Sequence, residues 1–196
     1  MQPPPSHGGG SLFNTASHNS DTAMRLSGDH PAAWVQGHMT DDSMIDGDFL
    51  RDDPTGQGII QFENGVTLYA ALTGRGSEYQ AICENGSVYI MDDGARIEMR
   101  VPGPSDHRGR SSLAPGQFPD DEPASAALNI VGDLVHSLDT GEPTRGGVRV
   151  ARVGLELSFA IIYSHRRGGV RVEMRLEHRD LLLKRVHAPR QPRYRA

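Results

Sequence analysis

A histidine and an aspartate stand three positions apart near the start of the chain, in the stretch "GGGSLFNTASHNSD" of residues 8–21. At helical spacing His18 and Asp21 lie on one face, so their side chains could act together. The pair could transfer protons, with the carboxylate fixing the imidazole tautomer, or supply two ligands to a metal ion. Ordinary capping explains the same spacing, because an acidic residue is favourable near a helix N-terminus. All three interpretations are open at this point.

The glycines that precede this pair do not form a phosphate-binding loop. A dinucleotide-binding loop needs G-x-G-x-x-G between a strand and a helix, and a P-loop ends in Gly-Lys-Ser/Thr. Neither pattern occurs in this stretch, and no strand is expected before Gly8. We interpret residues 1–10, which are mainly Pro, Gly and Ser, as a flexible lead-in, and we assign no cofactor-binding residue.

Other histidines and aspartates gather in the first quarter of the chain, which leaves a metal site as an alternative. These residues are His7, His18, His30 and His38 with Asp21, Asp41 and Asp42. We assign none of them as a metal ligand. The single cysteine, Cys83, excludes an internal disulfide and a cysteine-based zinc site. It falls in a predicted strand and no Gly-x-Ser-x-Gly occurs, so nucleophilic hydrolysis has no support.

The elements that must position these residues begin with a short helix over residues 17–26, followed by a strand over residues 32–37. Asn64-Gly65 and Asn85-Gly86 each stand between two apolar runs, the strongest short-range signal for a β-hairpin. Asp93-Gly94 then turns into a further strand. The middle of the chain therefore predicts at least five antiparallel strands.

Two helices are predicted in the second half of the chain. Residues 123–138 place apolar side chains at i, i+3, i+4 and i+7, which predicts one buried face, and residues 148–165 are apolar nearly all round. Residues 102–122 are rich in Pro, Gly, Ser and Asp and are predicted to form a long loop or lid, and residues 170–176 alternate as a strand. Hairpins followed by helices predict an α+β fold, an open and mostly antiparallel sheet with helices on one face.

Length, composition and charge limit the number of domains, the partners and the location of the protein. A chain of 196 residues with 36% apolar residues suits one domain, which we place at residues 11–188, followed by a basic tail at 189–196. Residues 166–196 carry ten basic and three acidic residues, whereas the rest of the chain has a net charge of −12. Few aromatics accompany these charges, so we expect no nucleic-acid partner. The longest apolar run is far shorter than the roughly 20 residues of a membrane span, so we expect no membrane contact. No secretory signal is visible and the chain has a single cysteine, so we expect a cytoplasmic protein.

Five segments resemble, in this order, the C-terminal domain of the Gfo/Idh/MocA family of NAD(P)-dependent oxidoreductases. They are "GGGSLFNTASHNSD", "DPTGQGIIQFENGV", "GRGSEYQAICENGSVYI", "VGDLVHSLDTGEPTRGG" and "RVGLELSFAIIYSHRRGGVRVEMRL". The resemblance covers about residues 8–186. It implies a substrate-side domain with an open antiparallel sheet, whose exposed face makes a homo-oligomer contact.

The resemblance also implies roles for individual residues. Family members typically carry Asp-x-x-x-His in the first segment and a lysine from the nucleotide-binding half, for proton transfer while NAD(P) exchanges a hydride with a sugar or polyol. His18 matches the histidine and Asp21 the acidic position after it, so we expect both to be catalytic. The aspartate of the pattern is Asn14 here, which cannot transfer a proton but can bind a hydroxyl. With Arg75 and Tyr79 it forms the expected substrate-binding set.

The family's nucleotide-binding half, with its glycine fingerprint and Glu-Lys-Pro segment, has no counterpart in these 196 residues. Lys184, the only lysine, stands near the far end of the chain and does not match the motif lysine. We therefore expect a substrate-binding and oligomerisation domain, recorded without its partner half and inactive alone, in which NAD or NADP belongs to the full-length enzyme. The alternative is a non-catalytic binding or assembly module derived from this domain.

Overall fold

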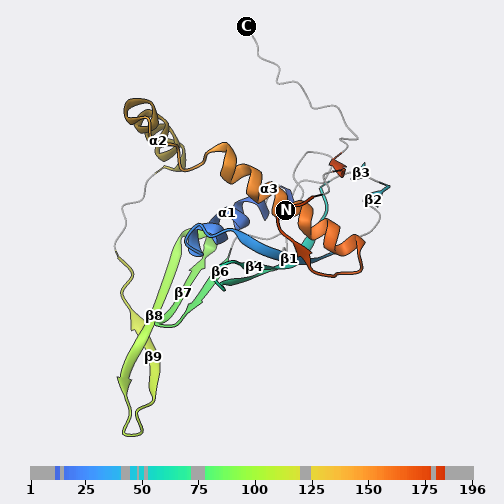
Figure 1. Ribbon diagram of the computed structural model, residues 1–196. Helices are drawn as coiled ribbons and strands as arrows, with labels where there is room; N and C mark the ends of the chain where they lie inside the picture. Colours follow the sequence, from blue (N-terminus) through green and yellow to red (C-terminus); the bar gives the residue numbers. More distant parts are fainter. Residues whose placement is uncertain are drawn as a thin grey trace. The chain divides into compact units, whose positions relative to one another are not determined.

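The structure is a computed structural model that describes residues 12–13, 16–40, 45–47, 49–50, 53–71, 78–119, 125–177 and 180–183 (Figure 1). The predicted lead-in of residues 1–10 and basic tail of residues 189–196 lie outside these ranges. The chain divides into two compact units. Unit 1 combines Met1–Gly74 with Gly146–Ala196, and unit 2 is Arg75–Arg145. The boundaries of a single domain at residues 11–188 stay a prediction.

Unit 1 contains a four-stranded antiparallel sheet with the strand order β10-β1-β4-β5. Its strands are β1 (Ala32–Met39), β4 (Gly56–Phe62), β5 (Thr67–Ala71) and β10 (Val172–Glu173). A smaller sheet with the order β11-β3-β2 pairs β11 and β3 in parallel. Its strands are β2 (Ile45–Asp46), β3 (Phe49–Leu50) and β11 (Leu182–Leu183). The strand predicted over residues 170–176 is therefore shorter than its alternating pattern suggested.

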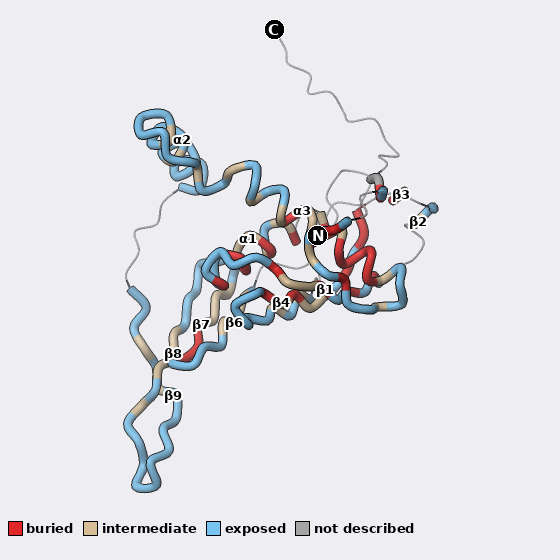
Figure 2. Tube along the Cα trace, in the orientation of Figure 1, coloured by how far each residue is buried: buried red, intermediate tan, exposed pale blue. Residues whose placement is uncertain are grey.

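Two helices pack beside the larger sheet. Helix α3 (Val148–Arg166) lies against β1 and β4, and α1 (Ala16–Leu26) packs on α3 (Figure 1). The buried stretches concentrate on α3 and the strands next to it (Figure 2). This core is mostly aliphatic. Its largest fully buried hydrophobic side chains are Phe62, Leu12, Met39, Leu50, Ile60, Leu157, Ile162 and Val35.

A glycine allows α3 to approach β1 closely. A Cβ atom added to Gly37 would lie 2.7 Å from Cγ2 and 2.8 Å from Cα of Ile161. The Gly37 N–H also donates to Oγ of Ser164 at 2.8 Å, and that hydroxyl donates to the Val170 carbonyl at 2.6 Å. Because any side chain at position 37 would collide with helix backbone, glycine fixes how near the helix comes to the strand.

The hairpin predicted at Asn64-Gly65 is confirmed, but its loop is longer than the two-residue turn that an Asn-Gly pair favours. The loop between β4 and β5 has four residues, and only Gly65 has a positive φ, of 89°. The Asn64 side chain accepts the Val66 N–H at 3.2 Å and donates to the Ser27 carbonyl at 2.8 Å. The asparagine therefore stabilises the turn through its amide and also ties it to the end of α1.

Unit 2 contains a second four-stranded antiparallel sheet, in the order β6-β7-β8-β9. Its strands are β6 (Tyr79–Cys83), β7 (Gly86–Met91), β8 (Arg96–Ser105) and β9 (Ser111–Gly116), with the 3₁₀ turn η4 (Asp92–Gly94) between β7 and β8. The two antiparallel sheets and three helices confirm the α+β prediction. In the second hairpin the two-residue turn is Glu84-Asn85, one position earlier than expected, and Gly86 begins β7.

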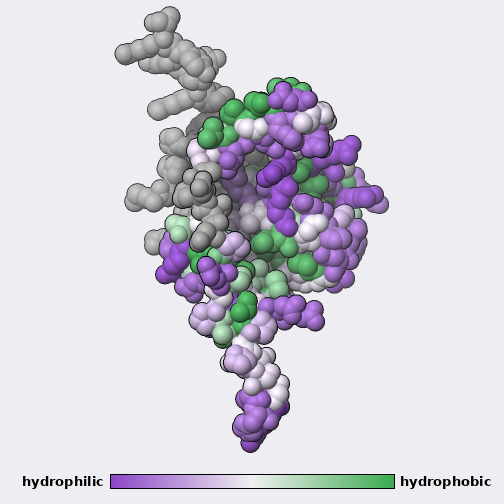
Figure 3. All heavy atoms as spheres, turned by 90° about the vertical axis from the view of Figure 1, so that its left-hand side faces the viewer, coloured by the Kyte–Doolittle hydropathy of each residue, from purple (hydrophilic) through white to green (hydrophobic). Residues whose placement is uncertain are grey.

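The loop or lid predicted over residues 102–122 is wrong, because most of it forms the β8–β9 hairpin. Asp106 closes the tip: its Oδ1 accepts the N–H groups of Arg108 at 2.8 Å and Arg110 at 2.9 Å. A shift in register between Pro102 and Ser105 accommodates Pro102 and Pro104, whereas Pro115 pairs with Arg100. Figure 3 shows the hydrophilic tip of this hairpin at the bottom of the view.

Helix α2 (Ala126–Thr140) is the third helix, and its pattern predicted a buried face. Among the residues that the structure describes, none on α2 is buried. The apolar face is exposed instead, and hydrophobic side chains gather at the surface over α2 at the top of Figure 3. They are Leu128, Ile130, Val131, Leu134, Val135 and Leu138. The periodicity correctly gave an amphipathic helix, but periodicity does not say which surface covers the apolar side.

Among the described helices, none has the length and apolar character that crossing a bilayer requires.

Candidate functional site

The segment before α1 is fixed by buried side chains of unit 1. Oδ1 of Asp53 accepts the N–H groups of Leu12 at 3.0 Å and Phe13 at 2.8 Å. Oγ of Ser158 on α3 donates to the Leu12 carbonyl at 3.0 Å. Asp53 is only 8% exposed, and Leu12 is fully buried. These contacts hold the chain just ahead of α1, so they fix the position at which the helix that carries His18 starts.

Sequence reasoning missed Asp53 as an anchoring residue. Its acidic surroundings suggested exposure, yet this carboxylate is buried because it satisfies two backbone donors. The following Pro54 belongs to the same anchor, since its carbonyl accepts the Leu12 N–H at 3.0 Å. The Asp-Pro step inside the acidic stretch was the available signal that the backbone turns there.

The first turn of α1 lies close to α3. A Cβ atom on Gly154 would be 3.7 Å from the Ser17 carbonyl oxygen, an ordinary contact distance, and Gly154 is buried in the interface. His18, the next residue, is exposed. An exposed imidazole on a well-anchored helix turn can accept and return a proton from a bound hydroxyl.

Asp21 follows one turn later on the same helix, as predicted, but its nearest charged partner is a different residue. Its Oδ1 lies 3.9 Å from Nε of Arg25, which also pairs with Asp29 at 3.7 Å. Within the described part of the chain, no hydrogen bond joins Asp21 to His18. Oδ1 of Asp21 is withdrawn from solvent and has no hydrogen-bond donor among the described residues. This carboxylate therefore keeps an unfilled acceptor close to His18 in sequence.

The expected substrate-binding residues are only partly described. Asn14 and Arg75 lie outside the described residues. Tyr79 is half-buried at the start of β6 and belongs to unit 2, whereas His18 belongs to unit 1. The structure thus gives the surroundings of His18, Asp21 and Tyr79 separately, and the substrate set stays a prediction.

The early histidines and aspartates do not form the alternative metal site within the described residues. No group of three or more His, Cys, Asp or Glu side chains there could hold a metal ion. His7, Asp41 and Asp42 lie outside the described ranges. His38 instead contacts His165 of α3, a residue far away in the sequence, and their ring centroids are 4.7 Å apart.

The hollows described in unit 1 surround Tyr163 and do not include His18 among their lining residues. The first has a volume of about 180 Å³ and is lined by Arg152, Leu155, Glu156, Phe159, Tyr163, Leu176 and Leu181. Both carboxylate oxygens of Glu156 are already bound, one to Arg152 Nη1 at 2.8 Å and one to the Leu176 N–H at 2.8 Å. A sugar needs several free polar partners, so this mostly apolar hollow does not suit one.

Tyr163 anchors the segment that follows β10. Its hydroxyl donates to the Asp180 carboxylate and accepts the N–H groups of Asp180 at 3.2 Å and Leu181 at 3.3 Å. Burial raises the pKa of Tyr163 above its usual 10.0, and the hydrogen bond to Asp180 raises this pKa further. A phenol held protonated in this way serves as a structural donor and not as a base.

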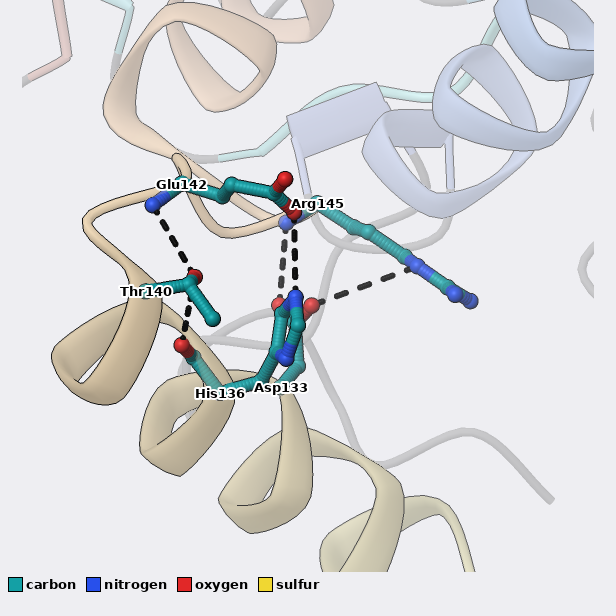
Figure 4. A network of polar contacts seen from close by, with 5 residues as sticks. All are labelled: Asp133, His136, Thr140, Glu142 and Arg145. Atoms are coloured by element: carbon teal, nitrogen blue, oxygen red, sulfur yellow. Dashed lines mark hydrogen bonds and ion pairs between the residues drawn. The ribbon is translucent and has the colours of Figure 1, made fainter.

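A polar network closes the C-terminal end of α2 in unit 2 (Figure 4). His136 Nε2 lies 3.0 Å from Oε2 of Glu142, and the Thr140 hydroxyl accepts the Glu142 N–H at 3.2 Å. Asp133 accepts the Arg145 N–H at 2.9 Å. Each of these polar groups has its partner within the network, so we interpret it as a cap that folds residues 141–145 back onto the helix.

Comparison with known proteins shows similarity in structure only. No protein-family model matches the sequence, and no curated protein matches it. The chain resembles the crystal structure of aldose-aldose oxidoreductase from Caulobacter crescentus complexed with glycerol, with a TM-score of 0.63 and 18% identity. That match covers 85% of this chain and 48% of the other.

Two further structures show the same relation. An inositol dehydrogenase homolog from Azotobacter vinelandii, complexed with NADH and myo-inositol, has a TM-score of 0.52 and 14% identity, covering 83% of this chain and 49% of its own. UDP-N-acetylglucosamine 3-dehydrogenase GnnA from Acidithiobacillus ferrooxidans has a TM-score of 0.58 and 10% identity, covering 82% and 48%. The chain spans about half the length of the solved structures that it matches. The resemblance noted in the sequence is therefore confirmed at the level of the fold, which this chain shares with one part of the Gfo/Idh/MocA oxidoreductases.

Proposed function

We propose that this chain is the substrate-binding part of an NAD(P)-dependent oxidoreductase that acts on a sugar or polyol. One observation supports it above others: 85% of the chain matches the fold of an aldose-aldose oxidoreductase. The assignment of His18 rests on the sequence resemblance. In this proposal His18 accepts the proton of a substrate hydroxyl, or returns it in the reverse direction.

The other predicted residues have supporting roles in this proposal. Asp21 orients His18, since its Oδ1 lacks a hydrogen-bond donor among the described residues and could accept one from an imidazole. Asn14 binds a substrate hydroxyl through its amide, and Arg75 and Tyr79 supply further polar contacts. A hydroxyl-rich ligand suits such a set, because each of these side chains offers hydrogen bonds.

NAD(P) would take or give the hydride in the complete enzyme. The described residues do not fit this cofactor, because none of the described strands precedes α1 and the only parallel pairing among them is the two-residue match of β11 with β3. A dinucleotide site needs a strand, a glycine-rich turn and a helix in a parallel unit. We therefore derive no hydride step through this chain and assign the cofactor to another part of the enzyme.

The test measures polyol binding and turnover separately with the purified chain. We expect weak binding of myo-inositol or glycerol, seen by ligand-observed NMR, and at least tenfold weaker binding by His18→Ala. His30→Ala is the matched control, because His30 is also exposed but follows the helix. We expect no reduction of NAD⁺ or NADP⁺ by this chain alone. Equal polyol binding by wild type and His18→Ala would contradict the role of His18, and NAD(P)H formation would contradict the assignment of the cofactor.

A second candidate is a non-catalytic assembly module, and the exposed apolar side chains of unit 2 favour it. Ile82 on β6 is 78% exposed and Leu138 on α2 is 76% exposed. Exposed apolar patches mark interaction surfaces. In this alternative the open sheet of β6–β9 associates with a second copy of the chain. A homo-oligomer that binds no polyol would favour the module, and a chain that binds polyol through His18 would favour the oxidoreductase part.

A further inference from the structure

Two histidines that are 127 residues apart in the chain meet at the surface of unit 1. His38 is near the end of β1 and His165 is in the last turn of α3. Their Nδ1 atoms lie 3.2 Å apart, and their rings are inclined by 71°. His38 is exposed and His165 is half-buried, so solvent and ions can reach the pair.

Hydrogen bonds between β1 and the end of α3 hold this pair in place. Strand β10 pairs with β1 only at Trp34 and Val35, which leaves the edge of β1 beyond Val35 free of a strand partner in the described residues. The end of α3 occupies this place: Ser164 accepts the Gly37 N–H, and Gln36 Nε2 donates to the Gly169 carbonyl at 2.7 Å. The residues directly before both histidines, Gly37 and Ser164, are thus bonded to each other, which limits how far the two rings can separate.

The distance between the nitrogens suits a shared metal ion as well as a shared proton. Imidazole nitrogens bind zinc at about 2.0–2.1 Å, so two nitrogens 3.2 Å apart would subtend an angle of roughly 100° at the metal. That angle lies between square-planar and tetrahedral values. A hydrogen bond between the rings needs a proton on one Nδ1 atom. When a metal ion binds both Nδ1 lone pairs, that proton moves to Nε2 of the same ring, so the ligand stays a neutral imidazole.

The electrostatic surroundings of the pair contain both favourable and unfavourable charges. His165 stands at the C-terminal end of α3, where the helix dipole favours a cation. The adjacent Arg166 and Arg167 are exposed and line a hollow with Tyr163 and Asp180, not with the histidines. Each imidazole would bind the metal ion as a neutral ligand, and water would complete the coordination.

We propose that His38 and His165 form a binding site for a late first-row divalent transition metal, with Nδ1 of each ring as a ligand. Borderline ions such as Cu²⁺, Ni²⁺ and Zn²⁺ prefer imidazole, with Cu²⁺ bound most tightly, whereas Mg²⁺ and Ca²⁺ need oxygen ligands and would not compete. The bound ion joins the end of α3 to β1. This site is independent of the function proposed for His18.

The test titrates the chelator-treated, tag-free chain with Cu²⁺, Ni²⁺ and Zn²⁺ by calorimetry. We expect one site per chain, tightest for Cu²⁺, and at least tenfold weaker binding by His38→Ala and by His165→Ala. A metal that binds the folded state also raises the melting temperature, and that rise should disappear in both variants. His136→Ala is the matched control, because His136 is exposed and has a carboxylate neighbour but no histidine neighbour.

Electron paramagnetic resonance of the Cu²⁺ complex reports directly on the ligands of the metal ion. In wild type the copper signal should show coupling to two imidazole nitrogens, and in either variant to at most one. A histidine that only stabilised the fold would not change this coupling. Circular dichroism verifies that the variants fold. If an alanine variant does not fold, His38→Asn or His165→Asn is used in its place. Unchanged metal affinity in a folded double variant would overturn the proposal, as would a wild-type chain that binds none of the three ions or gains no thermal stability from them.

Discussion

The two units of the molecule treat their apolar side chains in opposite ways. Every described hydrophobic side chain that is buried falls within residues 12–62 or 157–181, all in unit 1. Unit 2 has sheet strands and a helix of comparable length, yet none of its described hydrophobic side chains is buried. The same type of residue shows the contrast: Ile60 in unit 1 is 1% exposed, and Ile82 in unit 2 is 78% exposed.

This difference shows that strands and helices can form in a unit whose described residues include no hydrophobic core of their own. The hydrogen-bond ladders of β6–β9 and the cap of α2 form from local pairing, but burial supplies most of the free energy that favours a folded state. Unit 1 obtains this free energy from its own buried side chains. Unit 2 needs a covering surface to obtain it, so we expect its stability to depend on what it contacts.

The largest effect should come from removing matched isoleucine side chains in the two units. Ile60→Ala leaves a cavity in the core of unit 1 and should lower the free energy of unfolding by about 2–5 kcal/mol. Ile82→Ala removes an exposed side chain and should change it by less than about 0.5 kcal/mol. Urea denaturation followed by circular dichroism measures both. If the two variants lost similar amounts of unfolding free energy, the contrast between the units would be wrong, because Ile82 would then have to be buried.

A second comparison adds one methyl group to a glycine in each unit. Gly37→Ala forces Cβ into Ile161 of α3 and should cost about 1–3 kcal/mol, because the obstacle includes backbone. Gly132→Ala in α2 has nothing within 4 Å of the added Cβ and should stabilise that helix by up to about 1 kcal/mol. Opposite signs of the shift in melting temperature are the expected result. A neutral Gly37→Ala would mean that α3 is less closely packed on β1.

A third prediction uses pH to act on unit 1 alone. Because the folded state holds Tyr163 protonated, its raised pKa contributes stability in full below pH 10.0 and loses that contribution as pH rises through the folded-state pKa. Wild type should therefore lose stability above about pH 10 more steeply than Tyr163→Phe. At neutral pH the variant should be less stable by about 1–2 kcal/mol, since Asp180 and Leu181 lose a partner.

Tyr69→Phe is the control for this pH dependence, because Tyr69 is 75% exposed. Its unfolding should follow the wild-type curve. A Tyr163→Phe curve parallel to wild type above pH 10 would show that the anchor does not hold the phenol protonated.

The smallest effect on folding should come from charges on the apolar face of α2. Leu134→Glu combined with Leu138→Glu should alter the free energy of unfolding of the isolated chain by less than about 0.5 kcal/mol, because both side chains are at least half exposed. If the face contacts a second copy, the same variant should weaken association in sedimentation experiments. Asn129→Glu adds charge at an exposed polar position and should leave association unchanged. A large loss of stability in dilute monomer would show that the face is covered within the chain.

The sequence predicted the elements that depend on local patterns. Residues 17–26 and 148–165 agree with α1 and α3 to within one residue at each end, because helical periodicity and glycine stops act over a few positions. Both asparagine–glycine hairpins are present, although the turn types differ. Asn64 has a long-range role in binding the Ser27 carbonyl, and no turn signal carries that information.

Two errors have a common physical cause. The β8–β9 hairpin was mistaken for a loop because Pro102 and Pro115 weaken a strand signal. In the folded hairpin Pro102 lies where the register shifts, and Pro115 pairs with Arg100. The face of α2 was expected to be buried because composition along one helix cannot show what lies against it. In both cases tertiary contacts, or their absence, decided the outcome over local preference.

In the candidate site, only those features that depend on short spacing along the sequence could be predicted. His18 and Asp21 do share the first turns of one helix, but the ion pair of Asp21 with Arg25 and the anchoring of Leu12 by Asp53 were not foreseen. Asp53 is 41 positions from Leu12, and His38 is 127 from His165. Contacts at these separations depend on the completed topology and leave no pattern in a single sequence.

The position of Trp34 makes it possible to distinguish the unfolding of unit 1 from the unfolding of unit 2. It is the only tryptophan of the chain, it stands on β1 of unit 1, and the Arg171 guanidinium lies 3.8 Å from its ring centroid. Opening of unit 1 would remove this cation from the indole and expose the ring to water. Selectively excited fluorescence would therefore follow unit 1 alone, so a calorimetric transition without a change in emission could be assigned to unit 2.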